Sequence, residues 1–243
     1  MKNTYKSLLL AIAVTLSGPT LAEHHEGYSP NEALAVAWVK AGHTGKAATK
    51  AMVEENMAAD GVTHQNRYVG FGFSYDPQNE ESMIITNITP DSPASSVLME
   101  GDTFVSVQGI PATTENRERL SFRGKPGEAV KAVIKRGDKD IPVEISRGVI
   151  AAVTPKAEVL EGIESANAED WPVNEGRIVE VMSKDKVVYV VHEVKDTDNQ
   201  NGMVYEAYYM TRLEFNDAGK VASTRSMGED RFVLEQTGFS ISR

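Results

Sequence analysis

Two glycines, Gly70 and Gly72, interrupt a stretch that otherwise has the composition of a β-strand, RYVGFGFSYD at 67–76. Glycine weakens the interior of a strand, and it usually marks a bulge or the close approach of another backbone. A glycine pair also lets successive backbone N–H groups point the same way, which forms a concave site for an anion such as a carboxylate. Anion capture by backbone amides is therefore the first chemistry that the sequence indicates.

A phosphate-binding loop would also need closely spaced glycines, but the surrounding residues exclude it. The dinucleotide-binding pattern requires a third glycine at the position of Tyr75. The residues SYDPQNEES at 74–82 have the composition of a turn rather than of a helix, and the Lys-Ser or Lys-Thr ending of a P-loop does not follow. We therefore exclude nucleotide binding at this loop.

His192 is a candidate for acid–base chemistry. It shares a strand face with three valines, so we expect its side chain to be enclosed. A buried histidine near a carboxylate can act as a general base, whereas a core histidine bonded to backbone is the more frequent case. No acid–base pair in the sequence has a defensible spacing, so no catalytic residue is assigned. The weak candidates are His64, His192 and Arg212.

Composition and charge exclude several classes of protein. The chain of 243 residues has a net charge of −10 without clusters of Lys and Arg, which argues against a nucleic-acid partner. It contains no cysteine, which excludes disulfides, thiolate metal sites and cysteine nucleophiles. No apolar run approaches the ~20 residues of a transmembrane helix, so we expect no membrane span. We also expect no cofactor.

The first 22 residues have the pattern of a secretory signal peptide. Lys2 and Lys6 give a positive start, and LLLAIAVTL at 8–16 is an apolar run too short to span a bilayer. The small residue Ala22 marks the expected cleavage site. An uncleaved anchor is the alternative. We therefore expect the mature protein to be periplasmic or secreted.

Cleavage after Ala22 would expose an N-terminus that begins with Glu23, His24 and His25. A free amine with histidine in third place suits square-planar Cu(II) or Ni(II). An ordinary terminus without a metal is the more frequent case. We therefore assign no metal and keep His24 and His25 as weak candidates.

Two helices are expected before the glycine pair. Ser29 is an N-cap, Pro30 occupies the first helical position, and Glu32 completes a capping box. Gly42 is expected to end this helix. A second helix is expected over about 46–59. These helices carry apolar faces that need a sheet to cover.

Strands dominate the rest of the chain. Short strands, two short helices and a hairpin are expected over 83–148, and a helix over about 156–168. The strand MVYEAYYMTRLEF at 203–215 alternates, with Tyr209 and Thr211 on its more apolar face. The stretch RFVLEQTGFSI lies at the end of this region of long strands.

The residues Gly70–Phe73, followed by a strand, resemble the carboxylate-binding loop of PDZ domains. Downstream, ITPDSPASSVLMEGDTFVSVQGIPATT resembles the PDZ segment that carries a Ser-Pro-Ala helix and a Gly-Asp turn. RGKPGEAVKAVIKRGDKDIPVEISRG resembles the closing hairpin of bacterial PDZ domains. The resemblance covers about 68–149. It implies a PDZ-like β-sandwich or barrel with two short helices.

In PDZ domains, a peptide C-terminus adds as a strand to a sheet edge beside a helix. The resemblance implies that the carboxylate-binding residues are Gly70, Phe71, Gly72 and Phe73, the last three as backbone donors. It implies that the peptide groove is formed by Ser74, Tyr75, Asn116, Arg117 and Leu120. A PDZ fold that serves as a rigid spacer, without a peptide, is the alternative.

Bacterial PDZ domains often accompany serine proteases, but the sequence shows no protease signature. No Gly-x-Ser-x-Gly stretch occurs in the chain. We therefore expect a non-proteolytic protein that binds a partner protein or a peptide C-terminus. Formation of a homodimer is left open.

The flanks of the PDZ-like segment resemble SnoaL-like or ketosteroid-isomerase-like domains of the nuclear-transport-factor-two-like superfamily. The resemblance rests on NEALAVAWVKAGHTGKAATKAMVEENMAADGVTHQNRY and on GRIVEVMSKDKVVYVVHEV with the strands after it. It implies an α+β, cone-shaped, curved antiparallel sheet covered by helices. The expected division is a signal peptide at 1–22, a first part at 28–67, the PDZ-like domain at 68–149, a connector at 150–157 and a second part at 158–243. A small helical element with an independent C-terminal β domain is the alternative.

A cone-shaped sheet implies an interior pocket. The expected pocket residues are Trp38, Asp60, His64, His192, Tyr208 and Arg212. The superfamily includes isomerases and dehydratases, so the alternative function is a small-molecule-binding protein or enzyme that takes a small hydrophobic ligand in the cone. Fold alone does not give chemistry, so we favour the binding protein.

Overall fold

The computed structural model describes residues 27–75, 82–120, 122–168, 171, 174–198 and 201–238. The expected signal peptide and the candidate metal ligands His24 and His25 lie outside the described residues. No helix within the described ranges combines the length and the apolar character needed to cross a membrane. Strands make up most of the fold, together with four α-helices among the described residues.

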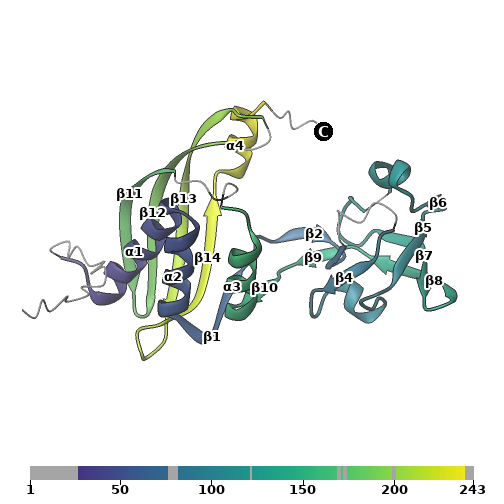
Figure 1. Ribbon diagram of the computed structural model, residues 1–243, viewed down its shortest axis with the longest axis horizontal. Helices are drawn as coiled ribbons and strands as arrows, with labels where there is room; N and C mark the ends of the chain where they lie inside the picture. Colours follow the sequence, from purple (N-terminus) through teal and green to yellow (C-terminus); the bar gives the residue numbers. More distant parts are fainter. Residues whose placement is uncertain are drawn as a thin grey trace, which may run out of the picture.

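Six strands form one sheet in the order β10-β1-β14-β13-β12-β11 (Figure 1). The strands are β1 (Met57–His64), β10 (Val153–Pro155), β11 (Glu175–Lys184), β12 (Val187–Thr197), β13 (Val204–Phe215) and β14 (Val221–Gly228). β1 pairs in parallel with β14 and antiparallel with β10. Strands from before and after the PDZ-like segment therefore share one sheet.

Helices α1 (Pro30–Thr44) and α2 (Lys46–Asn56) lie across one face of this sheet, and α3 (Lys156–Ser165) lies beside α2 and β1 (Figure 1). The predicted capping box of Ser29 and Glu32 is present. The sheet core consists of Ala35, Val39, Val188, Val190, Leu213, Phe215 and Val221. These apolar residues pack α1 against this face of the sheet.

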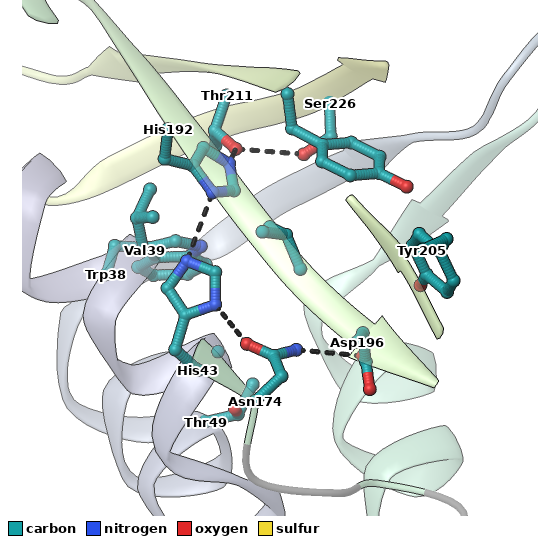
Figure 2. Close-up of a pocket in the computed structure, with 13 residues that line it drawn as sticks. Trp38, Val39, His43, Thr49, Asn174, His192, Asp196, Tyr205, Thr211 and Ser226 are labelled. Atoms are coloured by element: carbon teal, nitrogen blue, oxygen red, sulfur yellow. Dashed lines mark hydrogen bonds between the residues drawn. The ribbon is translucent and has the colours of Figure 1, made fainter. Parts of the chain in front are cut away.

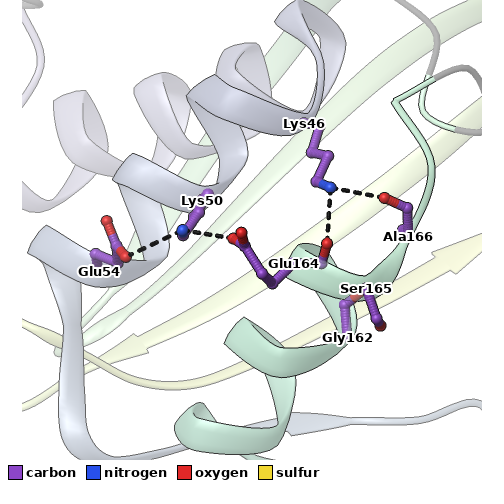
Figure 3. Close-up of polar contacts among 7 residues, drawn as sticks. All are labelled: Lys46, Lys50, Glu54, Gly162, Glu164, Ser165 and Ala166. Carbon is purple, nitrogen blue, oxygen red and sulfur yellow. Dashed lines mark hydrogen bonds and ion pairs between the residues drawn. The ribbon is translucent and has the colours of Figure 1, made fainter.

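Lysine side chains of α2, which precedes the PDZ-like segment, bind α3, which follows it (Figure 3). The Lys46 Nζ donates to the carbonyls of Glu164 and Ala166, at 2.9 and 2.6 Å. The Lys50 ammonium lies 2.5 Å from the Glu164 carboxylate. The last carbonyls of a helix have no partner inside the helix, so Lys46 satisfies groups that α3 leaves open.

Two helix boundaries differ from the prediction. α1 continues past Gly42 to Thr44. α2 ends at Asn56, not near residue 59, because Met57–His64 forms a strand with a bulge between Met57 and Val62. A Cβ at Gly61 would lie 2.9 Å from the Val221 carbonyl, so glycine permits this close approach.

Residues 68–150 form a separate set of strands with their own core. β2 (Tyr68–Gly70) pairs with β9 (Gly148–Ile150), and β3 (Phe73–Tyr75) pairs with β4 (Ile85–Ile88). A four-stranded sheet has the order β6-β5-β7-β8 and consists of β5 (Thr103–Val107), β6 (Ile110–Pro111), β7 (Ala129–Arg136) and β8 (Lys139–Ser146). The core of residues 68–150 includes Phe71, Met83, Ile85, Phe104, Val107 and Ile134.

The two short helices of this segment are both 3₁₀-helices, η1 (Pro93–Ser96) and η2 (Thr114–Arg119). The expected connector at 150–157 contains β10 and the first residues of α3. After the long strands, α4 (Asp230–Gln236) is a helix with an Arg231–Glu235 ion pair one turn apart. The Gln236 amide also bonds to the backbone of Glu206, which holds α4 against β13.

Candidate functional sites

Gly70 is the last residue of β2, and Gly72 lies in the bend between β2 and β3. Gly72 has φ of +82°, a left-handed conformation that favours glycine. A Cβ at this position would also lie 2.2 Å from the Cβ of Ser92. Both observations explain why the strand-like sequence contains a glycine here.

Two backbone N–H groups of this turn are left open within the described residues. The carbonyl of Phe71 accepts from the Ala94 N–H at 2.8 Å, and that of Gly72 accepts from the Thr89 N–H at 2.8 Å. The N–H groups of Phe71 and Gly72 themselves have no acceptor among the described residues. A turn with two open amides has the geometry of an anion site.

The strand after the turn has an open edge in the part of the chain that the structure describes. Because Thr89 donates to Gly72, the next pair in the ladder, Phe73 and Ile88, is of the non-hydrogen-bonded kind. The N–H and carbonyl of Phe73 therefore face away from β4. Within the described residues β3 pairs only with β4, so this side of the strand can accept another strand.

Aromatic rings form the floor of the turn. Phe73 lies 5.2 Å from Phe104 and 5.5 Å from Phe122 between ring centroids, and Phe71 lies 6.1 Å from Phe73. Phe122 was not predicted as a site residue, since it follows η2 in an irregular segment. These rings make the space beside β3 apolar.

The predicted groove residues differ in their contacts and in their burial. Tyr75 and Arg117 come together, with the guanidinium carbon 6.0 Å from the ring centroid. Asn116 lies on η2 and bonds to its neighbours Thr113 and Arg119. Leu120 is 7% exposed and belongs to the core of the PDZ-like segment, while Ser74 is exposed on β3.

Arg147 places a buried positive charge beside the turn, which the sequence analysis missed. Its side chain is 5% exposed and lies 3.2 Å from the Glu128 carboxylate. Its guanidinium carbon lies 5.4 Å from the centre of the Phe71 ring. It directly precedes Gly148, which pairs with Gly70. No local sequence pattern marks Arg147 as a site residue, because it is the pairing of β2 with β9 that brings it to the turn.

A second site is a pocket of about 320 Å³ between α1 and the covered face of the sheet (Figure 2). The lining residues come from α1, α2, the approach to β11, and β12 to β14. They are Trp38, Val39, Gly42, His43, Thr49, Asn174, His192, Val194, Asp196, Tyr205, Tyr209, Thr211 and Ser226.

A continuous chain of hydrogen bonds crosses this pocket (Figure 2). From one end, Asp196 contacts the Asn174 amide at 3.1 Å, and the Asn174 Oδ1 lies 2.5 Å from the His43 Nδ1. The His43 Nε2 lies 3.1 Å from the His192 Nδ1. At the other end, the His192 Nε2 lies 3.3 Å from the Thr211 Oγ1, which lies 3.1 Å from the Ser226 Oγ.

The environment keeps the inner histidine neutral. Burial, and to a smaller extent the nearby His43, lowers the pKa of His192 to about 4. Burial also raises the pKa of Tyr209 to about 12, with Tyr205 adding to the effect. At neutral pH both side chains are therefore uncharged hydrogen-bonding groups.

Two glycines make room for the rings of the pocket. A Cβ at Gly176 would lie 2.3 Å from the His43 ring, and a Cβ at Gly228 would lie 2.3 Å from the Tyr209 ring. The Asn174 N–H also donates to the carbonyl of His43 at 3.2 Å. The end of α1 is thus held against the start of β11 by backbone and side chain together.

Of the residues expected in the pocket, Trp38 and His192 line it. Asp60 is exposed at the bulge of β1, and Tyr208 is 45% exposed. Arg212 and His64 are cross-strand neighbours of Arg225, on the opposite face of the sheet from His192. Side chains alternate along a strand, so Tyr208 and Arg212 face away from Tyr209 and Thr211.

The face opposite the pocket has its own charge pattern. Arg212 bonds to Glu214 at 3.0 Å. Burial lowers the pKa of His64, and the charges of Arg225 and Arg212 lower it further. The charge of Arg212 therefore acts on His64, and both side chains lie on the face opposite His192. Within the described residues, no cluster of three or more acidic or histidine side chains is placed to hold a metal ion.

Comparisons with known proteins find no family model that matches the chain. Serine protease HTRA1 of Xenopus tropicalis is 32% identical over 71 residues, which are 29% of this chain and 15% of that protein. The chain therefore spans only a small part of the length of this curated relative.

Solved structures resemble parts of the chain. A crystal structure of the HtrA3 PDZ domain bound to a phage-derived ligand is 18% identical, covers 38% of this chain and 93% of that one, and gives a TM-score of 0.27. A protein from Catenulispora acidiphila with a ketosteroid isomerase-like fold is 13% identical, covers 37% and 68% of the two chains, and gives a TM-score of 0.31. The chain thus has weak similarity to HtrA-family proteins and a neighbour with each of the two folds.

Proposed function

We propose that this protein is a PDZ-containing binding protein that takes the C-terminus of a peptide or partner protein at the turn between β2 and β3. The observation that carries the proposal is the pair of open N–H groups of Phe71 and Gly72 at the end of the open edge of β3. A peptide added to that edge would place its terminal carboxylate on these amides and its last side chain over the phenylalanine rings.

Weak similarity to HtrA proteins supports the peptide-binding role. HTRA1 is named as a serine protease, and we state that activity of HTRA1 alone. Our proposal for this chain is binding alone, with residues 28–67 and 158–243 forming one split SnoaL-like domain around the PDZ-like domain. The shared sheet of β1, β10 and β14 supports this division.

Export to the periplasm or the medium is part of the proposal, supported by the residues of the leader alone. Expression of the full chain in a bacterial host, followed by intact-mass measurement of the exported fraction, tests it. Cleavage after Ala22 predicts the mass of the chain that begins at Glu23. Recovery of uncleaved chain in the membrane fraction would instead support the anchor.

The binding proposal is tested with a library of heptapeptides that carry free C-terminal carboxylates. The tightest peptide is then compared with its C-terminal amide by fluorescence polarisation. Hydrogen bonds to a charged group contribute about 1.5–3 kcal/mol, so the amide should bind at least tenfold more weakly. Equal binding of the two forms, or no binder in the library, contradicts the proposal.

A pair of tyrosine variants locates the groove. Tyr75→Ala removes a ring that packs with Arg117 beside the open edge and should weaken binding of the same peptide several-fold. Tyr208→Ala removes an exposed ring from β13 and should leave binding unchanged. Equal effects of the two variants would place the peptide elsewhere.

A further inference from the structure

The hydrogen-bond chain in the pocket of the six-stranded sheet has a fixed direction. The Asn174 amide donates through Nδ2 to Asp196, so its carbonyl oxygen faces His43. A carbonyl oxygen can only accept, and the His43 Nδ1 therefore carries a proton. Asp196 and Asn174 are positioning residues that set the tautomer of His43.

The tautomer of the second histidine follows from the first. In neutral His43 the Nε2 is a bare acceptor, so the His192 Nδ1 must donate to it. The His192 Nε2 is then bare and accepts from the Thr211 hydroxyl, which in turn accepts from Ser226. Every donor along the chain points toward Asp196.

This polarity makes the two histidines a proton acceptor for an oxygen in the pocket. When the His192 Nε2 takes a proton, directly or through the Thr211 hydroxyl, the proton on the His192 Nδ1 passes to the His43 Nε2. The donor oxygen loses one proton and His43 gains one, so charge and protons balance. The imidazolium formed at His43 lies in the last turn of α1, where the helix dipole favours positive charge.

The lining of the pocket defines the class of ligand. Trp38, Val39, Val194, Tyr205 and Tyr209 provide aromatic and apolar walls. Among the described lining residues the only charged side chain is Asp196, which already bonds to Asn174 and to the backbone of Thr197. An anionic ligand would therefore find no counter-charge. A volume of about 320 Å³ suits a small molecule.

We propose that this pocket binds a small, uncharged, largely apolar molecule that carries a hydroxyl group, and that His43 and His192 accept the proton of that group. This function is separate from peptide binding at the turn between β2 and β3. It assigns the pocket an acid–base role in which His192 contacts the ligand and His43 stores the proton.

Two helix glycines give a matched pair of variants for the binding test. Gly42 lies on α1 and lines the pocket, while Gly162 lies on α3, and a Cβ at either position would meet no atom within 4 Å. Replacing either by leucine raises helix propensity, so both variants should fold with unchanged or higher Tm. Only Gly42→Leu should fill the pocket.

The probe is 2-naphthol, with 2-naphthoate as the anion of similar shape, and binding is measured by calorimetry at neutral pH. We expect saturable binding of 2-naphthol and at least tenfold weaker binding of 2-naphthoate. Gly42→Leu should weaken 2-naphthol binding at least tenfold, and Gly162→Leu should leave it unchanged. Absence of 2-naphthol binding to the unmodified protein, or equal binding by the two variants, overturns the ligand assignment.

Proton transfer has its own readout, because excited 2-naphthol is a strong acid whose naphtholate form emits at longer wavelength. Bound 2-naphthol should show naphtholate emission that falls several-fold in His192→Gln and stays in His64→Gln, whose histidine lies on the opposite face. Unchanged emission in His192→Gln overturns the relay. If His192→Gln does not fold, nitrogen NMR of the unmodified protein decides, since the relay requires both histidines to be protonated at Nδ1.

Discussion

The PDZ-like segment, from β2 to β9, builds its core from neighbouring stretches of chain. The six-stranded sheet instead builds its core from residues that precede and residues that follow this segment. The first core spans Phe71 to Ile145 without interruption by other elements. The second joins Ala35 and Val39 of α1 to strands β12 to β14. A local segment can carry its function in a short motif, while a split sheet assembles its site from distant residues.

This difference explains what the sequence could predict. The residues Gly70–Phe73 and the paired strands β3 and β4 lie close together in the sequence, so turn chemistry and resemblance could indicate an anion site there. The capping box at Ser29 was predictable for the same reason, because all its parts lie within one turn of helix.

The pocket was predicted only in part. The alternation of β13 was assigned correctly, but Tyr208 and Arg212 were chosen for their polarity from the face that points away from α1. His43 lies just beyond the expected end of α1, and Asn174 lies in the approach to β11. No local pattern links these two residues, since only the sheet order brings them together.

The largest expected effect comes from removing the PDZ-like segment. The Gln65 N–H donates to the Ala152 carbonyl at 3.0 Å, so the chain leaves and re-enters the sheet at one place. Replacing residues 66–151 by Asn-Gly would close β1 and β10 as a hairpin. The shortened protein should lose all peptide binding and keep cooperative unfolding and 2-naphthol binding. An aggregated or molten product, judged by near-ultraviolet circular dichroism, would break the comparison.

Core substitutions should separate the two regions energetically. Ile134→Ala and Leu213→Ala each truncate a side chain with 0% exposure, one in each core. Such truncations cost about 2–5 kcal/mol. In calorimetric unfolding, each variant should lower the transition of its own region and leave the other transition in place. A shift of both transitions by both variants would mean that the regions unfold as one unit.

A smaller effect is expected from acid. His192 faces His43 from α1 and Tyr209 from β13, and burial lowers its pKa to about 4, below its ordinary value of 6.5. The unfolded chain therefore binds more protons than the folded sheet between about pH 6.5 and about pH 4. The sheet should lose stability as the pH falls through that window.

The PDZ-like segment should respond at lower pH. The hydrogen bonds of Arg136 to the buried Asp102 hold the pKa of that carboxyl below its ordinary value of 3.8. The stability from this pair is present above about pH 3.8 and is lost below it. Thermal unfolding across this range should show the transition of the sheet falling first. His192→Gln should flatten that early fall more than His64→Gln, and equal slopes in both variants would contradict the assignment to His192.

The pairing of β1 with β14 has a consequence for the order of folding. It joins residues that are far apart in the sequence, such as His64 and Arg225, and closing such a long loop costs conformational entropy that slows folding. The β2–β9 pair brings Tyr68 next to Ile150. Once the PDZ-like segment has folded, the chain between β1 and β10 is in effect a short connection. We expect this segment to form first and to act as an internal template that speeds closure of the surrounding sheet.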